Sequence, residues 1–208
     1  MTLQQYLHAN IFNQTIYQHL QNDFDHWYEL LCQKIAFHFD SHLHGINHCG
    51  RVLLYALILA DKLGLDDKSK TILCHTAVFH DSKRFDDGYD IGHGKRGADY
   101  YKDYCQKHEL PFYKESYWAS YYHDLPDDIG MNEISKQSDN NKNALFLYRL
   151  FKDADALDRY RLGLDALDKK FLRIDESKQL AEFGKQLVLA TEDDVPNSVS
   201  ELKGLLNV

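Results

Sequence analysis

Four side chains from three distant segments of the sequence carry the atoms that proteins use to bind divalent metal ions. His80 and Asp81 are adjacent and end an apolar run, His48 lies upstream of them, and Asp153 lies downstream. Two imidazoles and two carboxylates form a mixed nitrogen and oxygen ligand set that suits a borderline or hard divalent cation. Because four ligands do not fill an octahedron, water or a substrate oxygen can occupy the remaining positions. A metal with an open position and an acidified water is a hydrolytic centre.

The downstream ligand has competitors. Asp155 and Asp158 lie in the same apolar segment as Asp153. Acidic residues are unusual in an apolar helix unless they are paired or bound to a cation. Asp158 could instead form a salt bridge with Arg161, which is three residues further along the chain.

A further histidine, His44, lies four residues before His48. On a helix the two would share a face and could bind zinc together. Gly45 and Asn47 indicate, however, that the helix begins here, which places His48 on the helix and leaves His44 in the preceding loop. We therefore interpret His44 as a residue that lines the pocket or the start of the helix.

The elements that must position these residues all have the pattern of helices. The strongest is His48–Leu63, where apolar residues recur at i, i+3, i+4 and i+7 and a second apolar face lies beside the first. Asp66 and Asp67 can cap the next helix, Lys68–Phe79, which leads into His80 and Asp81. No segment alternates with a period of two over more than a few residues. We therefore predict an all-α fold.

The remaining segments complete this expectation. Further helices are expected at Leu3–Leu20, Phe24–Phe39, about Gly97–His108, Tyr113–His123 and Ala144–Leu162, with one or two after Phe171. The glycine-rich stretch Phe85–Gly97 is typical of a loop, and the polar stretch Glu133–Lys142 is typical of an exposed turn.

Bulk properties exclude several classes of partner. The chain has 208 residues, of which 44% are hydrophobic, and a formal net charge of −8. An acidic surface repels phosphate backbones, so we expect neither a nucleic-acid polymer nor a membrane as partner. There is no apolar run of about 18 residues, no secretion signal and no C-x-x-C pair among the 4 cysteines. We therefore predict a cytoplasmic protein.

Three segments, His44–Val52, Phe79–Asp81 and Lys152–Arg159, resemble in order the motifs of the HD-domain superfamily of metal-dependent phosphohydrolases. The resemblance spans roughly residues 40–165. It implies that residues 1–208 form a single HD-type helical bundle with helical additions at both ends. Carried over by position, it implies that the metal ligands are His48, His80, Asp81 and Asp153.

The resemblance also bears on the number of metal ions. Some HD proteins hold a second metal ion with two extra histidines, and the Asp of the His-Asp pair bridges the two ions. His93 and His123 fit these positions in order. The alternative is that both histidines bind a substrate phosphate over a single metal ion.

Cations near such a site would neutralise phosphate oxygens. Lys83 and Arg84 directly follow the His-Asp pair, and Lys95 and Arg96 follow His93. These four are the candidates for phosphate binding. Some family members carry a water-orienting carboxylate where this chain has Arg84, so the general base stays unassigned.

Another cation is interpreted differently. Arg51, three residues after His48 in the strongest predicted helix, is expected to be a buried structural partner of a carboxylate.

The sequence therefore predicts a phosphomonoesterase or phosphodiesterase that acts on a small phosphorylated metabolite, with nucleotides among the candidates. Asp81 would hold the metal, Lys83 would stabilise developing charge, and His123 or Asp124 would protonate the leaving group. One or two divalent ions are expected, with manganese, iron, cobalt, nickel, zinc and magnesium all compatible with the ligands. Two alternatives stay open: a di-iron oxygenase on the same scaffold, and a non-catalytic binding module stabilised by metal.

Overall fold

A computed structural model describes residues 1–137 and 141–206, and every regular element in these residues is a helix. The all-α prediction is confirmed for this part of the chain. The α-helices are α1 (Leu3–Asn10), α2 (Gln21–Gln33), α3 (Ile46–Lys62), α4 (Asp67–Phe79), α5 (His93–Lys107), α6 (Lys114–Tyr122), α7 (Asp127–Gln137), α8 (Asn141–Leu157), α9 (Asp175–Thr191) and α10 (Val199–Leu206). Three 3-10 helices are η1 (Gln18–Leu20), η2 (Asp158–Leu162) and η3 (Lys169–Phe171).

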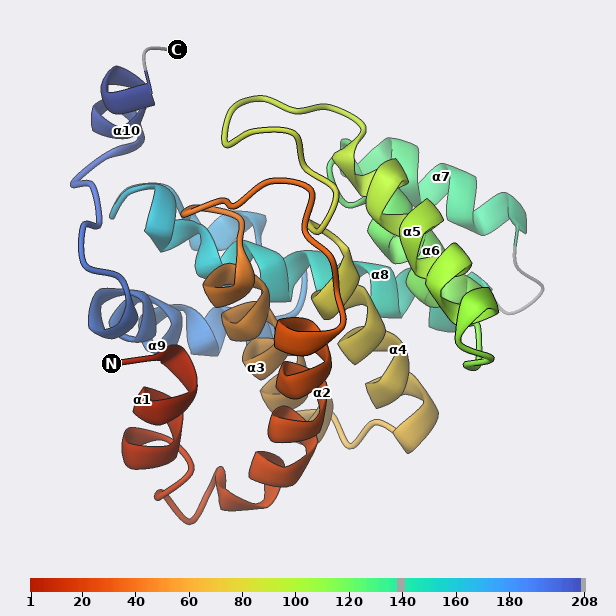
Figure 1. Ribbon diagram of the computed structural model, residues 1–208, viewed down its shortest axis with the longest axis horizontal. Coiled ribbons are helices and arrows are strands. Elements are labelled where there is room, and N and C mark those ends of the chain that lie inside the picture. The colour runs from red at the N-terminus through yellow and green to blue at the C-terminus, as the bar shows by residue number, and fades with distance from the viewer. Residues whose placement is uncertain (138–140, 207–208) are drawn as a thin grey trace.

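Helix α3 is the centre of the core. All its residues from His48 to Ala60 are buried, as its two apolar faces predict. It contacts α2, α4, α8 and α9. In Figure 1, α5, α6 and α7 lie on one side of α4, and α9 and α1 lie on the other side of α3. The site residues therefore come from helices that are themselves fixed by packing.

The start of α4 follows the predicted capping chemistry. The Asp66 side chain accepts a hydrogen bond from the Ser69 backbone N–H at 2.8 Å. Gly64, between α3 and α4, has a φ of +60°, a conformation that glycine adopts at little cost. The short connection makes α3 and α4 neighbours, and it brings the end of α4 close to the start of α3.

Some helix boundaries differ from the prediction because their caps come from distant residues. Helix α5 begins at His93, inside the stretch expected to be a loop. The Asp124 carboxylate accepts hydrogen bonds from the backbone N–H groups of Gly92 at 2.7 Å and Gly94 at 3.4 Å, which satisfies donors at the start of this helix. Local sequence holds no signal of that contact.

Other boundaries also shift. The expected helix Leu3–Leu20 is interrupted after α1, and Phe24–Phe39 is replaced by α2, which starts earlier and ends at Gln33. The first part of the expected turn Glu133–Lys142 is helical in α7, and residues 138–140 lie outside the described residues. Pro126 precedes α7, and acidic residues occupy its first turn, which favours a helix start.

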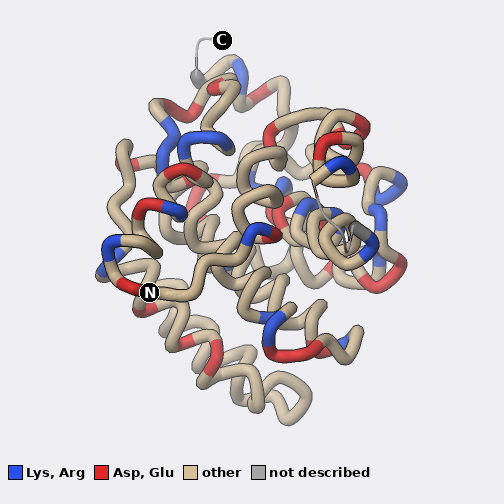
Figure 2. The backbone as a smooth tube through the Cα atoms, turned by 90° about the vertical axis from the view of Figure 1, so that its right-hand side faces the viewer, with Lys and Arg blue, Asp and Glu red and all other residues tan. Residues whose placement is uncertain are grey.

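Charged residues of both signs share the molecular surface. Along the tube in Figure 2, Lys and Arg alternate with Asp and Glu over the face shown. Among the described residues, no helix combines the length and apolar character that crossing a bilayer requires.

Gly97 allows α5 to approach the end of α4 closely. A Cβ atom at this position would lie 2.5 Å from the His80 carbonyl oxygen and 2.8 Å from the Phe79 carbonyl oxygen. These oxygens belong to the backbone and cannot rotate away. The contact therefore sets how near His93, at the start of α5, comes to His80 and Asp81.

Gly97→Ala should lower the free energy of unfolding by about 1–3 kcal/mol, because the added methyl group forces the two helices apart. Gly204→Ala is the matched control, since a Cβ atom on that α10 glycine meets nothing within 4 Å. The control should be neutral or stabilising by about 0.5–1 kcal/mol. Urea titrations followed by circular dichroism measure both changes, and equal effects would contradict the close-contact explanation.

Candidate metal centre

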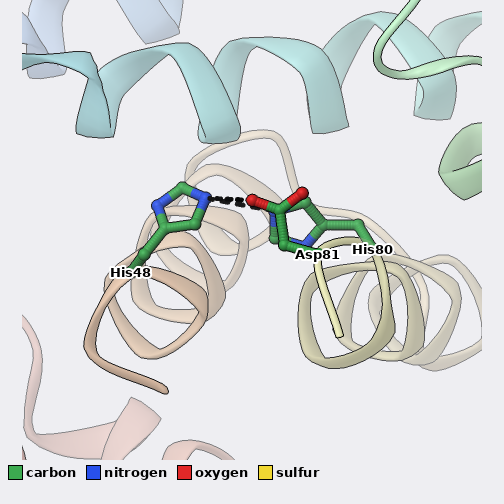
Figure 3. Close-up of side chains that lie close together, drawn as sticks. All are labelled: His48, His80 and Asp81. Atoms are coloured by element: carbon green, nitrogen blue, oxygen red, sulfur yellow. Dashed lines mark hydrogen bonds and ion pairs between the residues drawn. The ribbon is translucent and has the colours of Figure 1, made fainter. Parts of the chain in front are cut away.

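Three predicted ligands, His48, His80 and Asp81, form one buried cluster. His48 lies in the first turn of α3, and the other two follow α4 directly. In Figure 3 the three side chains point toward one another beneath α8. The Nε2 atoms of the two histidines are 3.2 Å apart, and Asp81 Oδ2 lies 3.4 Å from the first and 3.7 Å from the second. These spacings let one ion contact all three side chains.

A second cluster uses the other oxygen of the same carboxylate. Asp81 Oδ1 lies 3.1 Å from His93 Nε2 and 3.4 Å from His123 Nε2, and these two nitrogens are 3.0 Å apart. All three side chains are buried. Two buried His/Asp triads that share Asp81 could therefore hold metal ions.

All four imidazoles direct Nε2 toward Asp81 and Nδ1 away from it. Each Nδ1 faces a hydrogen-bond acceptor: for His80 the Ala77 carbonyl at 3.0 Å, for His123 the Ser120 carbonyl at 2.6 Å, for His93 the Asp90 carbonyl at 2.6 Å and for His48 the Asp158 carboxylate at 2.8 Å. A carbonyl oxygen only accepts, so we assign the ring hydrogen to Nδ1. When it is neutral, such a ring presents the lone pair of Nε2 toward Asp81, as a metal ligand does.

The electrostatics of the cluster favour a cation. Burial is the largest effect on Asp81 and would raise its pKa, but the surrounding histidines hold that pKa well below its usual range. Burial lowers the pKa of His80 to about 3 and so keeps this ring neutral. Burial and the Arg161 charge oppose protonation of His48, yet hydrogen bonds with Asp155, Asp158 and Asp81 raise its pKa to about 9. A proton on His48 can thus balance the carboxylates when no metal does.

The structure does not bring Asp153 to this cluster, contrary to the position that the family resemblance implied. Its buried carboxylate accepts hydrogen bonds from the backbone N–H groups of Arg173 at 2.9 Å and Ile174 at 2.8 Å, and from Arg173 Nη1 at 2.9 Å. Ile174 is the N-cap of α9. Asp153 therefore joins α8 to the start of α9 and has no free oxygen directed at the histidines.

Asp155 is the carboxylate of this segment that approaches the cluster. Its Oδ1 lies 3.3 Å from His48 Nε2, and its side chain lines the same pocket as Asp81. Burial opposes ionisation of Asp155, but the hydrogen bond and charge of His48 hold its pKa well below the usual range. Two residues along a helix correspond to a rotation of about 200°, so Asp153 and Asp155 face nearly opposite sides.

Asp158 and Arg51 support the cluster from behind. Asp158 binds His48 Nδ1, and it also accepts hydrogen bonds from Arg51 Nε at 2.6 Å and Nη2 at 3.0 Å. Both side chains are fully buried, which confirms the expectation that Arg51 is a structural partner of a carboxylate. Arg51 Nη1 reaches Glu192 at 2.5 Å, beyond the end of α9. The alternative pairing of Asp158 with Arg161 has a separation of 3.8 Å and is the longer contact.

A pocket of about 740 Å³ opens beside the clusters. Asp81, His93, His123 and Asp155 contribute to its wall. His44 does too, in agreement with its predicted pocket-lining place; its Nδ1 lies 3.1 Å from Asp87 Oδ1. Burial lowers the pKa of His44 to about 4, so this ring is neutral.

Of the four cations predicted to bind phosphate, only Arg84 lines this pocket. Lys83 Nζ donates a hydrogen bond to the Ala36 carbonyl and lies 3.7 Å from the centre of the Tyr100 ring. Lys95 is exposed and pairs with Asp99 at 2.6 Å. Arg96 pairs with Asp90 at 2.6 Å and stacks 3.9 Å over Phe85.

The pocket instead gains cations that sequence reasoning did not select. Lys152, Arg159, Arg161 and Arg173 all line it. Lys152 and Arg173 are paired with Asp127 at 2.8 Å and 2.6 Å. The run of residues 151–161 shows three of these cations beside the acidic residues, and Arg173 lies outside it. Only the folded arrangement reveals which of them face the pocket.

No protein-family model matches this chain, and neither a curated protein nor a solved structure matches it. The resemblance to HD-domain proteins therefore rests on the sequence motifs, together with the helical fold and the buried clusters that those motifs form.

Asp153→Asn and Asp155→Asn should separate structure from metal binding. The first should lower the free energy of unfolding of the metal-free protein by about 1.5–3 kcal/mol, and with it the melting temperature, because hydrogen bonds to a charged group at the start of α9 weaken. The second should weaken metal binding about ten-fold or more. Calorimetric titration with Mn²⁺ or Zn²⁺ and thermal melts measure both. Weak metal binding in the Asp153 variant, with normal binding in the Asp155 variant, would reverse the assignment.

Proposed function

We propose that this chain is an HD-type, metal-dependent phosphohydrolase that cleaves phosphoric esters of a small metabolite. The observation that supports this most strongly is the orientation of four buried imidazoles, whose Nε2 atoms all face the two oxygens of Asp81. An open pocket with a buried cation, Arg84, adjoins them. Metal ligands beside a pocket that contains arginine side chains are the parts that hydrolysis of a phosphoryl group needs.

The proposed ligands divide into two sets. One ion would be held by His48, His80, Asp81 and Asp155, and the other by Asp81, His93 and His123. Imidazole nitrogen and carboxylate oxygen suit manganese, iron, cobalt, nickel, zinc or magnesium. A divalent ion bound there would lower the pKa of a water ligand to about 7 and polarise a phosphoryl oxygen.

The side chains of the pocket supply the remaining roles. Arg84 would bind phosphoryl oxygens, in place of Lys83, whose amine is held elsewhere. His123 would act as a ligand and not as a proton donor, because its Nδ1 is bound to the Ser120 carbonyl and its Nε2 faces Asp81. Asp124 keeps one carboxylate oxygen, Oδ1, without a hydrogen-bond partner among the described residues. Asp124 lines the pocket but this oxygen is itself buried, so the proton donor for the leaving group stays unassigned.

Asp81→Ala should abolish metal binding and turnover together, because each triad loses its carboxylate. Metal content by mass spectrometry and phosphate release from p-nitrophenyl phosphate measure the two effects. Lys95→Gln is the matched control, since this exposed side chain lies outside the pocket and should keep both properties. Full activity of the Asp81 variant would rule out the proposed centre.

His93→Ala should reduce the metal content from two equivalents per chain to one. The change removes a ligand from the second triad and none from the first. The protein should be purified without added metal and assayed by mass spectrometry. If the wild type holds one equivalent and His93→Ala does not change it, the hypothesis of a second metal ion is wrong. That result would favour a role for His93 and His123 in binding substrate.

Colour and oxygen consumption test the alternative function, a di-iron oxygenase that uses the same ligands. A colourless preparation that cleaves p-nitrophenyl phosphate supports hydrolysis. Oxygen consumption by iron-loaded protein, without release of phosphate, would favour the oxygenase instead.

A further inference from the structure

Two arginines in the pocket, Arg84 and Arg161, are buried without a close carboxylate partner. Each residue is only 6% exposed. Within the described residues, the nearest carboxylate oxygens lie 3.9 Å from Arg84 and 3.8 Å from Arg161. These distances exceed those of hydrogen-bonded ion pairs.

The two nearby carboxylates are already engaged. The one nearest to Arg84 is Asp81, which faces histidines on both of its oxygens. The one nearest to Arg161 is Asp158, which binds Arg51 and His48 at distances between 2.6 and 3.0 Å. Neither carboxylate comes within hydrogen-bond distance of the pocket arginines.

Backbone carbonyl groups hold the two guanidinium groups in place. Arg84 donates to the carbonyls of Asp86 at 3.2 Å and Gly88 at 2.7 Å, while its Nη1 lies 3.2 Å from His93 Nε2. Arg161 donates to the carbonyls of Leu43 at 2.6 Å and Asp158 at 3.1 Å. Carbonyl groups fix the direction of a guanidinium but leave its charge unneutralised. A buried guanidinium group without a hydrogen-bonded carboxylate is costly, so these positions favour a bound anion.

The other cations of the pocket show the contrast. Lys152 and Arg173 share the Asp127 carboxylate. Arg159 is exposed, and its Nε donates to the Ala166 carbonyl. Of the cations that line the pocket, only Arg84 and Arg161 combine burial and a fixed orientation with the lack of a hydrogen-bonded carboxylate. Arg161 binds the carbonyl of Leu43, the residue before His44, and Arg84 binds the carbonyls on either side of Asp87, whose carboxylate lies 3.1 Å from His44 Nδ1. Both arginines therefore lie around His44, in one part of the pocket wall.

We propose that Arg84 and Arg161 together bind the unesterified oxygens of a terminal phosphoryl group and so select phosphomonoesters over phosphodiesters. This inference rests on the proposed function. A monoester carries three unesterified oxygens and close to two negative charges at neutral pH. It can offer oxygens to the metal side and to both arginines. A diester has two such oxygens and one charge, and its second ester group would meet the buried guanidinium groups.

The direct test compares binding of methyl phosphate and dimethyl phosphate, measured by calorimetric titration of the protein as purified, with its metal content determined. Wild type should bind methyl phosphate at least about ten-fold more tightly. Arg84→Gln and Arg161→Gln should each weaken methyl phosphate binding by about ten- to hundred-fold, as expected for a hydrogen bond to a charged group. Dimethyl phosphate binding and metal content should change little. Lys95→Gln should match wild type.

Several outcomes would overturn this specificity. They are equal binding of the two esters by wild type, equal weakening of both esters in the variants, or weakening that follows loss of metal. Arg161→Lys, which keeps the charge but loses the planar fork, should lie between wild type and Arg161→Gln. Circular dichroism melts check folding; if Arg161→Gln does not fold, Arg84→Gln carries the test alone.

Turnover assays with p-nitrophenyl phosphate and bis-p-nitrophenyl phosphate separate this proposal from the proposed function. Selective binding of methyl phosphate without hydrolysis of either substrate would contradict the hydrolase and support the arginine pair. Hydrolysis of both substrates with equal preference would support the hydrolase and overturn the arginine pair.

Discussion

The buried carboxylate of Asp81 is the constraint on which the arrangement of the site depends. One oxygen faces His48 and His80, and the other faces His93 and His123. A buried carboxylate requires positive charge nearby, and the rings supply it only where they are protonated, as the raised pKa of His48 allows. Bare nitrogens of neighbouring rings only 3.0 and 3.2 Å apart add to this demand. A cation between them satisfies the nitrogen and the oxygen atoms at once.

The fold meets this demand by bringing helix ends together. His80 and His123 are the C-caps of α4 and α6, His93 is the first residue of α5, and His48 lies in the first turn of α3. At a helix end the backbone leaves carbonyl or N–H groups unpaired, and carbonyls of the last turn orient His80 and His123 through Nδ1. The unpaired carbonyl groups at the ends of α4 and α6 therefore orient the imidazoles of His80 and His123.

The sequence was sufficient for the parts of the site that depend on local pattern. Helical periodicity predicted α3 and α4, and the change from apolar run to glycine-rich loop identified His80 and Asp81 as the residues at a helix end. The choice between Asp153 and Asp155 was beyond it, because both lie in one short acidic segment. Helix phase decides this choice: Asp155 is four residues after Phe151, whose ring packs 5.2 Å from His80, whereas Asp153 faces α9. The start of α5 was missed since its cap, Asp124, is about thirty residues away along the chain.

The placement of the cations also depends on contacts that the local sequence does not reveal. Lys83 is two residues from Asp81 and turns away to the Ala36 carbonyl, whereas Arg84, three residues from Asp81 in the same turn, stays beside the carboxylate. Adjacency in sequence therefore says less than spacing. Spacing alone, however, does not show whether a cation is neutralised. Arg96 and Arg173 are satisfied by aspartates, while Arg84 and Arg161 are held by carbonyl groups. The charge that remains for a ligand is thus a property of tertiary contacts, and it separates the arginines that fix the fold from the two for which we propose a phosphoryl ligand.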